Sequence, residues 1–269
     1  MEKEKFDVSV ILPVNSSKNK DFDLLFDRAV KSLSIQNVDI NELVVVHSGE
    51  DSLKIFLDEY DFSGLTVNKI QNDGDFDFCT QVNLGVKNAN SKWVSILEFD
   101  DEYSSIWFKN AKRFSDSYSD VDAFLPLVVD TDDKGMFVGF TNEATFAASL
   151  TNEIGYLSNE VLLTYQNFQS SGMVIKKSTF EDNGGFKPSI KLTFVYEFLL
   201  RLTYNSVKIM TIPRIGYKHM NLREGSIFWN YKNGEEKVSD NEVQFWIESA
   251  KKEHFFTNDR DIKYAPQVV

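Results

Sequence analysis

Cysteine and histidine are scarce in this sequence, whose 269 residues include one cysteine and three histidines. The single cysteine, Cys79, excludes a disulfide within the chain, and its place in an expected helix predicts a small core residue. One cysteine and three scattered histidines also exclude a standard structural zinc site. No stretch approaches the roughly 20 apolar residues that span a bilayer, and MEKEKFD at the start lacks the apolar run of a signal peptide. We therefore expect a soluble, cytoplasmic protein without a membrane span.

Basic residues are also fewer than acidic ones: the chain has 29 Lys and Arg and 41 Asp and Glu, which gives a formal net charge of -12. No Lys/Arg run offers the basic face of a nucleic-acid-binding protein, which argues against such a partner. The motifs GxGxxG, GxxxxGK[ST] and GxSxG are absent, so neither dinucleotide binding, P-loop binding nor that type of hydrolase chemistry is indicated. An acidic protein that binds a polyphosphate would need a local cation, which a divalent metal would supply.

The first hundred residues alternate apolar strands with helices. Strands are expected at 8–14, 43–46, 65–70 and 93–97, and helical apolar spacing fills the segments between them. Strands that are apolar throughout indicate a parallel sheet covered on both faces. In such sheets ligands bind outside the carboxyl ends of the strands, which here are residues 13–17, 47–51, 71–75 and 98–102.

The second half is less regular. Strands are expected at 123–129, 172–176 and 209–215, with loops and short helices over 130–168. Thr193 is placed to cap a helix, and Ser239 and Glu242 have the spacing of a capping box that opens a C-terminal helix.

The strongest local signal is LEFDDEYS, where Glu98, Asp100 and Asp101 follow the end of an apolar strand. Carboxylates this crowded repel one another unless they are solvated or neutralised by a cation. Mg²⁺ or Mn²⁺ binds through one or two carboxylates and shares the phosphate oxygens of a substrate. Residues 98 and 100 lie on the same side of an extended segment, so both could address one site. The alternative is an acidic turn that opens the next helix.

The order of the segments resembles that of family 2 glycosyltransferases with the GT-A fold. VSVILPV looks like the first strand of that family, and ELVVVHSGEDS looks like the strand and turn that hold the nucleoside. QVNLGVKNANSKWVSILEFDDE is similar to the asparagine-bearing helix, the next strand and the DXD-type metal motif. SSGMVIKKSTFEDNGGF and FVYEFLLRL resemble the acceptor-side strand and the catalytic helix. Together these segments cover roughly residues 7–225.

The resemblance implies an α/β fold of the GT-A type, a mostly parallel Rossmann-like sheet flanked by helices, with a helical C-terminal tail. It implies a glycosyltransferase domain over 1–238, with a nucleotide-sugar half at about 1–104 and an acceptor half at about 105–238. Residues 239–269 would form the C-terminal helix and tail. The expected donor is a UDP- or GDP-sugar, with Mn²⁺ or Mg²⁺ as cofactor. The acceptor would be a glycan, a protein or another hydroxyl compound, and inversion at the anomeric carbon is the expectation.

Site residues follow from the same resemblance. Glu98, Asp100 and Asp101 would hold the metal, with Asp100 the firmest, and His219 in RIGYKHMNLREGS would be a further ligand. Arg223 in that segment would neutralise the diphosphate. The nucleotide-sugar contacts are expected from Pro13, Asn15, Ser48, Asn83, Asp100 and Arg223. A structural histidine and a surface ion pair are the alternatives for residues 219 and 223.

Two pairs of residues depart from the family pattern, and so does Glu98, which replaces the first aspartate of the metal motif. His47 and Ser48 stand where members often have aspartates that contact the base, and Phe194 and Val195 stand where many have an acidic pair. The nearest carboxylate is Glu197. It would act as the base that deprotonates the acceptor, or it would pair with Arg201 one turn later.

Asp182 is the second candidate base, on the turn before two glycines, and its alternative is a role in the turn alone. Two rival functions stay open. A nucleotidyltransferase would share the sheet and the metal, although NSSKNKD after the first strand lacks glycine. A non-catalytic sugar- or nucleotide-binding protein on a degenerate GT-A fold would explain the altered catalytic helix.

Overall fold

The computed structural model describes residues 3–18, 21–62, 64–151, 153–221, 223–253 and 255. Its strands are β1 (Val8–Val14), β2 (Glu42–His47), β3 (Val67–Gln71), β4 (Trp93–Ile96), β5 (Glu102–Tyr103), β6 (Ala123–Thr131), β7 (Phe137–Thr141), β8 (Tyr156–Leu157), β9 (Val174–Lys176) and β10 (Ile209–Met220). Its helices are α1 (Phe22–Ser34), α2 (Asp51–Glu59), α3 (Phe78–Asn88), α4 (Trp107–Ser117), η1 (Glu143–Phe146), α5 (Asn159–Thr164), α6 (Lys177–Asp182), α7 (Phe194–Tyr204), α8 (Ile227–Asn233) and α9 (Asp240–Lys251).

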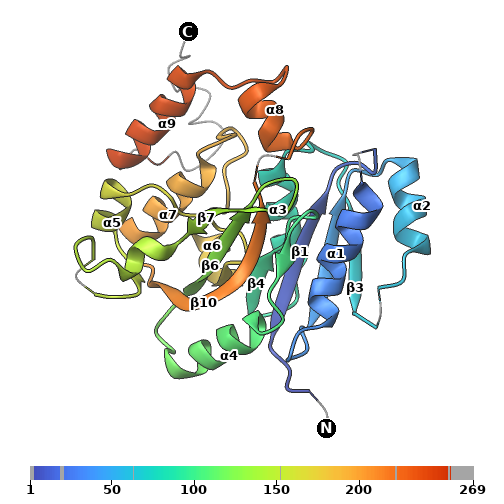
Figure 1. The fold of residues 1–269 in the computed structure, drawn as a ribbon, viewed down its shortest axis with the longest axis horizontal. Coiled ribbons are helices and arrows are strands. Elements are labelled where there is room, and N and C mark those ends of the chain that lie inside the picture. The colour runs from blue at the N-terminus through green and yellow to red at the C-terminus, as the bar shows by residue number, and fades with distance from the viewer. Residues whose placement is uncertain are drawn as a thin grey trace.

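One sheet runs through the molecule in the order β3-β2-β1-β4-β9-β6-β10-β5, with β7 beside β6 and β8 beside β10 (Figure 1). Strands β3, β2, β1 and β4 are parallel, and β6 and β10 are parallel to each other. The short strand β9 is antiparallel to both β4 and β6 and joins the two parallel groups. The expected mostly parallel α/β sheet flanked by helices is confirmed.

Apolar side chains on both faces of the sheet form two buried clusters. One cluster combines residues of β1, β2 and β4 with α3, α5, α7 and α9, and the other combines the opposite side chains with α1, α2 and α4. Helix α3 can lie close to β1 because residue 85 is glycine. A Cβ at Gly85 would come within 2.4 Å of Ile11 Cγ2. Cys79 of α3 is buried in the first cluster, as predicted.

The structure corrects the expectation for residues 130–168, where the sequence predicted loops and short helices. This segment also contains β7 and β8. The sequence does not indicate β7, because a half-buried strand is recognised by alternating apolar and polar residues and this strand lacks that alternation. Three of its apolar side chains face solvent: Phe137, Val138 and Phe140 are 44–60% exposed. Strand β10 is also longer than expected and carries His219 near its end.

The starts of α7 and α9 lie at the residues that the sequence indicated as caps. Ser239 accepts a hydrogen bond from the Glu242 backbone N–H at 3.1 Å, which confirms that helix start. Thr193 is the N-cap residue of α7, as predicted, but its side chain makes no capping hydrogen bond. Of the expected tail over 239–269, α9 is confirmed as a helix, and residues 254 and 256–269 lie outside the described residues.

The carboxyl end of β1 lies toward α8, at the opposite end of the molecule from the N-terminus (Figure 1). Residues at the ends of β1, β4 and β10, together with the start of α8, line one cavity. Within the described part of the chain, no helix combines the length and apolar character that crossing a membrane requires.

Candidate nucleotide-sugar site

A cavity of about 430 Å³ opens at the carboxyl ends of the central strands. Its wall combines the ends of β1, β4 and β10, one face of α3, the loop before β9, and the starts of α7 and α8. Its lining includes Pro13, Asn15, Phe78, Gln81, Glu98, Asp100, Ser171, Phe194, Val195, His219, Arg223 and Phe228. The cavity therefore occupies the edge of the sheet that the sequence predicted for a ligand.

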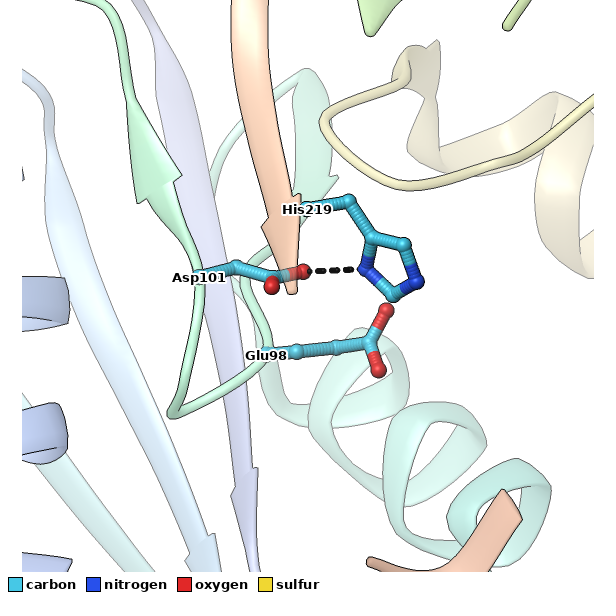
Figure 2. Close-up of side chains that lie close together, drawn as sticks. All are labelled: Glu98, Asp101 and His219. Carbon is cyan, nitrogen blue, oxygen red and sulfur yellow. Dashed lines mark hydrogen bonds and ion pairs between the residues drawn. The ribbon is translucent and has the colours of Figure 1, made fainter. Parts of the chain in front are cut away.

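Glu98 and His219 line one end of this cavity, and Asp101 is buried beside His219. Each offers one ligand atom, and these atoms lie within 4.8 Å of one another. Figure 2 shows the Glu98 carboxylate directed toward the His219 ring and the Asp101 carboxylate bonded to one nitrogen of the same ring. His219 Nδ1 is 2.9 Å from Asp101 Oδ2. The fold thus joins the loop after β4 to the end of β10.

Backbone and hydroxyl groups fix these side chains. The Met220 N–H donates to Asp101 Oδ1 at 2.8 Å, so both oxygens of this buried carboxylate are engaged. The Ser171 hydroxyl donates to Glu98 Oε1 at 3.1 Å. The backbone N–H of Glu98 donates to the Tyr217 hydroxyl at 3.0 Å. The cluster is therefore held in place by the sheet itself and by the loop before β9.

Asp100 is placed differently from what the sequence predicted. Residues 98–101 form a turn rather than an extended segment, with a hydrogen bond from the Asp101 N–H to the Glu98 carbonyl at 3.1 Å. Asp100 lines the cavity, and its Oδ2 accepts a hydrogen bond from Arg223 Nε at 2.8 Å. The three side chains whose ligand atoms are close enough to share a metal are those of Glu98, Asp101 and His219, without Asp100. The role of Asp100 as the firmest metal ligand stays a prediction. In the structure its partner is the guanidinium of Arg223.

Arg223 is almost fully buried beside this turn. Its guanidinium lies 5.1 Å from the ring centroid of Phe99, and its Nη2 has no hydrogen-bond partner among the described residues. A buried donor without a partner costs about 1–3 kcal/mol. Since Arg223 lines the cavity, an anionic group of a ligand would remove this cost.

Burial and neighbouring negative charge raise the pKa values of Glu98 and Asp100. Burial, with the charges of Asp101 and Asp100, raises the pKa of Glu98 to about 8. Burial and the charge of Asp101 also raise the pKa of Asp100, although Arg223 opposes them. Burial alone would lower the pKa of His219, but the charge and hydrogen bond of Asp101 and the charges of Glu98 and Asp100 raise it to about 10. The site therefore favours added positive charge.

The donor set fits a divalent cation. Two carboxylates and an imidazole suit Mn²⁺, and the carboxylates suit Mg²⁺. His219 also has the arrangement common in metal-binding histidines, in which one ring nitrogen bonds a carboxylate and the other stays available for the metal. A cation would have to displace the proton from that second nitrogen.

The expected nucleotide contacts divide into two groups. Pro13 and Asn15 line the cavity, as Asp100 and Arg223 do. Ser48 and Asn83 are not among the lining residues. Asn83 instead bonds the backbone of Phe186 through both amide atoms, at 2.7 and 2.9 Å, and so holds the turn after α6.

The two candidate bases do not line the cavity either. Glu197 is 3% exposed, and its carboxylate binds Arg201 Nε and Nη2 at 2.9 Å each and Lys187 Nζ at 3.0 Å. This is the ion-pair alternative, except that the pair is buried rather than on an exposed face. Asp182 lies at the end of α6 with an exposed side chain.

Other residues of the wall were not found by sequence reasoning. Gln81 and Ser171 line the cavity, but a glutamine in an amphipathic helix and a serine in a loop carry no distinctive spacing. Phe168 and Phe228 also line it, and in a chain with 23 phenylalanines the sequence does not separate such rings from those of the core. Spatial assembly alone identifies these side chains.

Comparison with known proteins gives matches among solved structures. No protein-family model and no curated protein matches the chain. The chain is similar to S. aureus TarS 1-349, with a TM-score of 0.60 and 17% identity over 98% of this chain and 76% of that one. The same TarS fragment in complex with UDP-GlcNAc gives a TM-score of 0.63 and 19% identity, over 91% and 66% of the two chains.

The TarS fragment in complex with UDP gives a TM-score of 0.59 and 16% identity. Against a longer TarS structure, this chain spans 46% of the length. The likeness establishes that this chain has the mixed α/β fold of the glycosyltransferase TarS. Membership of family 2 stays a prediction.

Proposed function

We propose that this protein transfers a sugar from a nucleotide diphosphate-sugar, held with a divalent cation, to a hydroxyl acceptor. The observation that carries the proposal is one cavity that combines the group Glu98, Asp101 and His219 with the buried Arg223, whose Nη2 has no partner among the described residues. A cation site beside an arginine suits a diphosphate. The fold is that of TarS, which has been crystallised with UDP and UDP-GlcNAc, so a UDP-sugar is the first donor to test.

Each group has a distinct task in this proposal. Glu98, Asp101 and His219 hold the Mn²⁺ or Mg²⁺, which when bound neutralises the diphosphate and stabilises its departure as the leaving group. Asp101 orients His219 through its hydrogen bond. Arg223, positioned by Asp100, donates to the diphosphate through Nη2. The apolar side chains of the far wall exclude water from the sugar.

A second candidate function is metal-dependent binding without transfer. Among the described residues that line the cavity, the carboxylates are Glu98 and Asp100, both at the cation end, and Val195 occupies the wall near the start of α7. An acceptor hydroxyl there would find no separate carboxylate to take its proton. This favours a binding protein on a glycosyltransferase fold, or an acceptor that is itself ionised.

Calorimetry tests the binding part of the proposal. We expect UDP to bind in the presence of Mn²⁺ and at least about tenfold more weakly after chelation with EDTA. His219→Gln should remove this dependence on Mn²⁺, and the matched variant His47→Gln, outside the cavity, should keep it. Absence of UDP binding to the folded wild-type protein with Mn²⁺ would overturn the proposal.

Turnover separates the two candidates. Release of UDP from UDP-sugars, measured with a set of glycan, protein and small hydroxyl acceptors, would establish transfer. Binding of UDP with no release under any acceptor would favour the non-catalytic function.

A further inference from the structure

Three phenylalanine rings from different helices meet at the wall of the cavity. Phe78 lies 5.7 Å from Phe194 and 5.5 Å from Phe228, and the rings of Phe194 and Phe228 stack at 5.9 Å. All three line the cavity, and so does Val195. These four side chains are apolar, whereas the carboxylates of the lining lie at the cation end. Lys232, one turn after Phe228 on α8, also lines the cavity.

Gln81 interrupts the apolar wall with one polar atom. Its side chain is fully buried and lines the cavity one helical turn after Phe78, on the same face of α3. Gln81 Nε2 donates to the Phe76 carbonyl at 2.9 Å, which fixes the orientation of the amide. Gln81 Oε1 has no hydrogen-bond partner among the described residues.

The wall therefore offers one buried hydrogen-bond acceptor next to aromatic rings, while the donor of the same amide is already engaged. A buried acceptor without a partner is costly, so a ligand that brings an N–H or O–H to Oε1 is favoured. A ligand group that fits this wall would pair one donor with a small apolar surface.

We propose that this wall is a subsite for the acetamido group of a 2-acetamido sugar. The amide N–H would donate to Gln81 Oε1, and the methyl group would pack against the Phe78, Phe194 and Phe228 rings. The inference rests on the proposed function, since it assigns the sugar class of that donor.

A plain hydroxyl fits the wall less well. A hydroxyl that donates to Gln81 leaves its own lone pairs against aromatic rings, where they lose the hydrogen bonds that water gave them. An acetamido N–H has no such lone pair, and its carbonyl can face the open part of the cavity. The wall should therefore discriminate between the two substituents.

The test compares two donors that differ at this substituent. Affinities for UDP, UDP-glucose and UDP-N-acetylglucosamine are measured by calorimetry with Mn²⁺ on the whole chain. We expect UDP-N-acetylglucosamine to bind about tenfold more tightly than UDP-glucose, or better. This comparison needs no variant, so a folding defect cannot obscure it.

Variants then assign the preference to one atom. Gln81→Leu and Gln81→Met remove the acceptor at similar size and should abolish the preference of the protein for UDP-N-acetylglucosamine over UDP-glucose. Gln244→Leu, on the exposed side of α9, is the matched control and should retain the preference.

Equal affinity of the wild-type protein for the two sugars would overturn the inference and leave the proposed function standing. A preference that persists in folded Gln81→Leu and Gln81→Met would also overturn the assignment to Gln81. Failure of UDP itself to bind would overturn the proposed function and this inference with it.

Discussion

Arg223 Nε donates to Asp100 Oδ2 at 2.8 Å, a contact between residues 123 positions apart in the sequence. It joins the acidic turn after β4 to the segment that follows β10. Both side chains are largely buried, with exposed fractions of 9% and 11%. The turn and the arginine therefore form one unit, in which Asp100 positions the guanidinium of Arg223 and Asp101 positions the His219 ring.

This division of roles predicts different effects for the two aspartates. Asp101→Asn should lower the affinity for Mn²⁺ by about 10–100-fold, because it disturbs the carboxylate beside His219. Asp100→Asn should lower it less, since Asp100 binds Arg223. Calorimetry with Mn²⁺ alone, alongside circular dichroism, measures both. The opposite order would make Asp100 the firmer ligand, as the sequence suggested.

Arg223→Lys should weaken the binding of UDP about tenfold and leave the binding of uridine nearly unchanged. Lysine keeps the charge but cannot bond Asp100 and a diphosphate through one planar group. Arg214→Lys is a matched control, because Arg214 is exposed and donates to the neighbouring Pro213 carbonyl at 2.9 Å. Equal losses for UDP and uridine would give Arg223 a structural role.

Glu197→Gln should destabilise the fold rather than act on transfer alone. The carboxylate forms ion pairs with both Arg201 and Lys187 in a buried site, and Arg201 also binds backbone carbonyls of the turn after α6. Loss of one partner from a buried ion pair costs about 3 kcal/mol or more. Denaturant unfolding should show this loss, and Glu248→Gln on α9 should show little. A stable variant with reduced transfer would instead identify Glu197 as the base.

Acid should destabilise the protein partly through His47. Burial, with a contribution from Lys54, lowers the pKa of this imidazole, and its Nδ1 accepts from the Gly49 N–H at 3.2 Å. The unfolded chain therefore binds a proton at a higher pH than the folded one, so stability falls as the pH drops below about 6.5.

His47→Asn keeps an acceptor for Gly49 and cannot be protonated in this range. Its unfolding free energy should decline less than that of the wild type between pH 7 and pH 5. Parallel declines in the two proteins would show that His47 does not contribute.

The sequence was informative where packing imposes a strong pattern. Strand β1 has the predicted bounds, because seven successive buried residues leave little ambiguity. The acidic turn was found for a related reason, since carboxylates directly after a buried strand are unusual. Strand β9 was expected near residues 172–176, but its antiparallel direction was not, because direction depends on partners far along the chain.

The contacts between side chains of the site could not be predicted from the sequence for the same reason. Whether Asp100 or Asp101 meets His219 depends on the turn at residues 98–101, and one residue of shift exchanges their roles. Gln81 is notable only because its neighbours across the cavity are aromatic rings. The roles of Pro13, Asn15, Ser48, Asn83, Asp182 and Glu197 stay predictions, although the structure puts only the first two at the cavity.

The late position of β10 determines when the site is complete during synthesis. Asp101 is made 118 residues before His219, which at ordinary translation rates is an interval of roughly 6–24 s. Over that interval the carboxylates of the turn have neither the imidazole nor the Met220 amide that hold them in the finished protein. A nascent chain that stops before residue 219 would contain the strands of the first half but no complete pocket. The cavity and its acidic cluster are therefore completed late, with the emergence of β10 and α8.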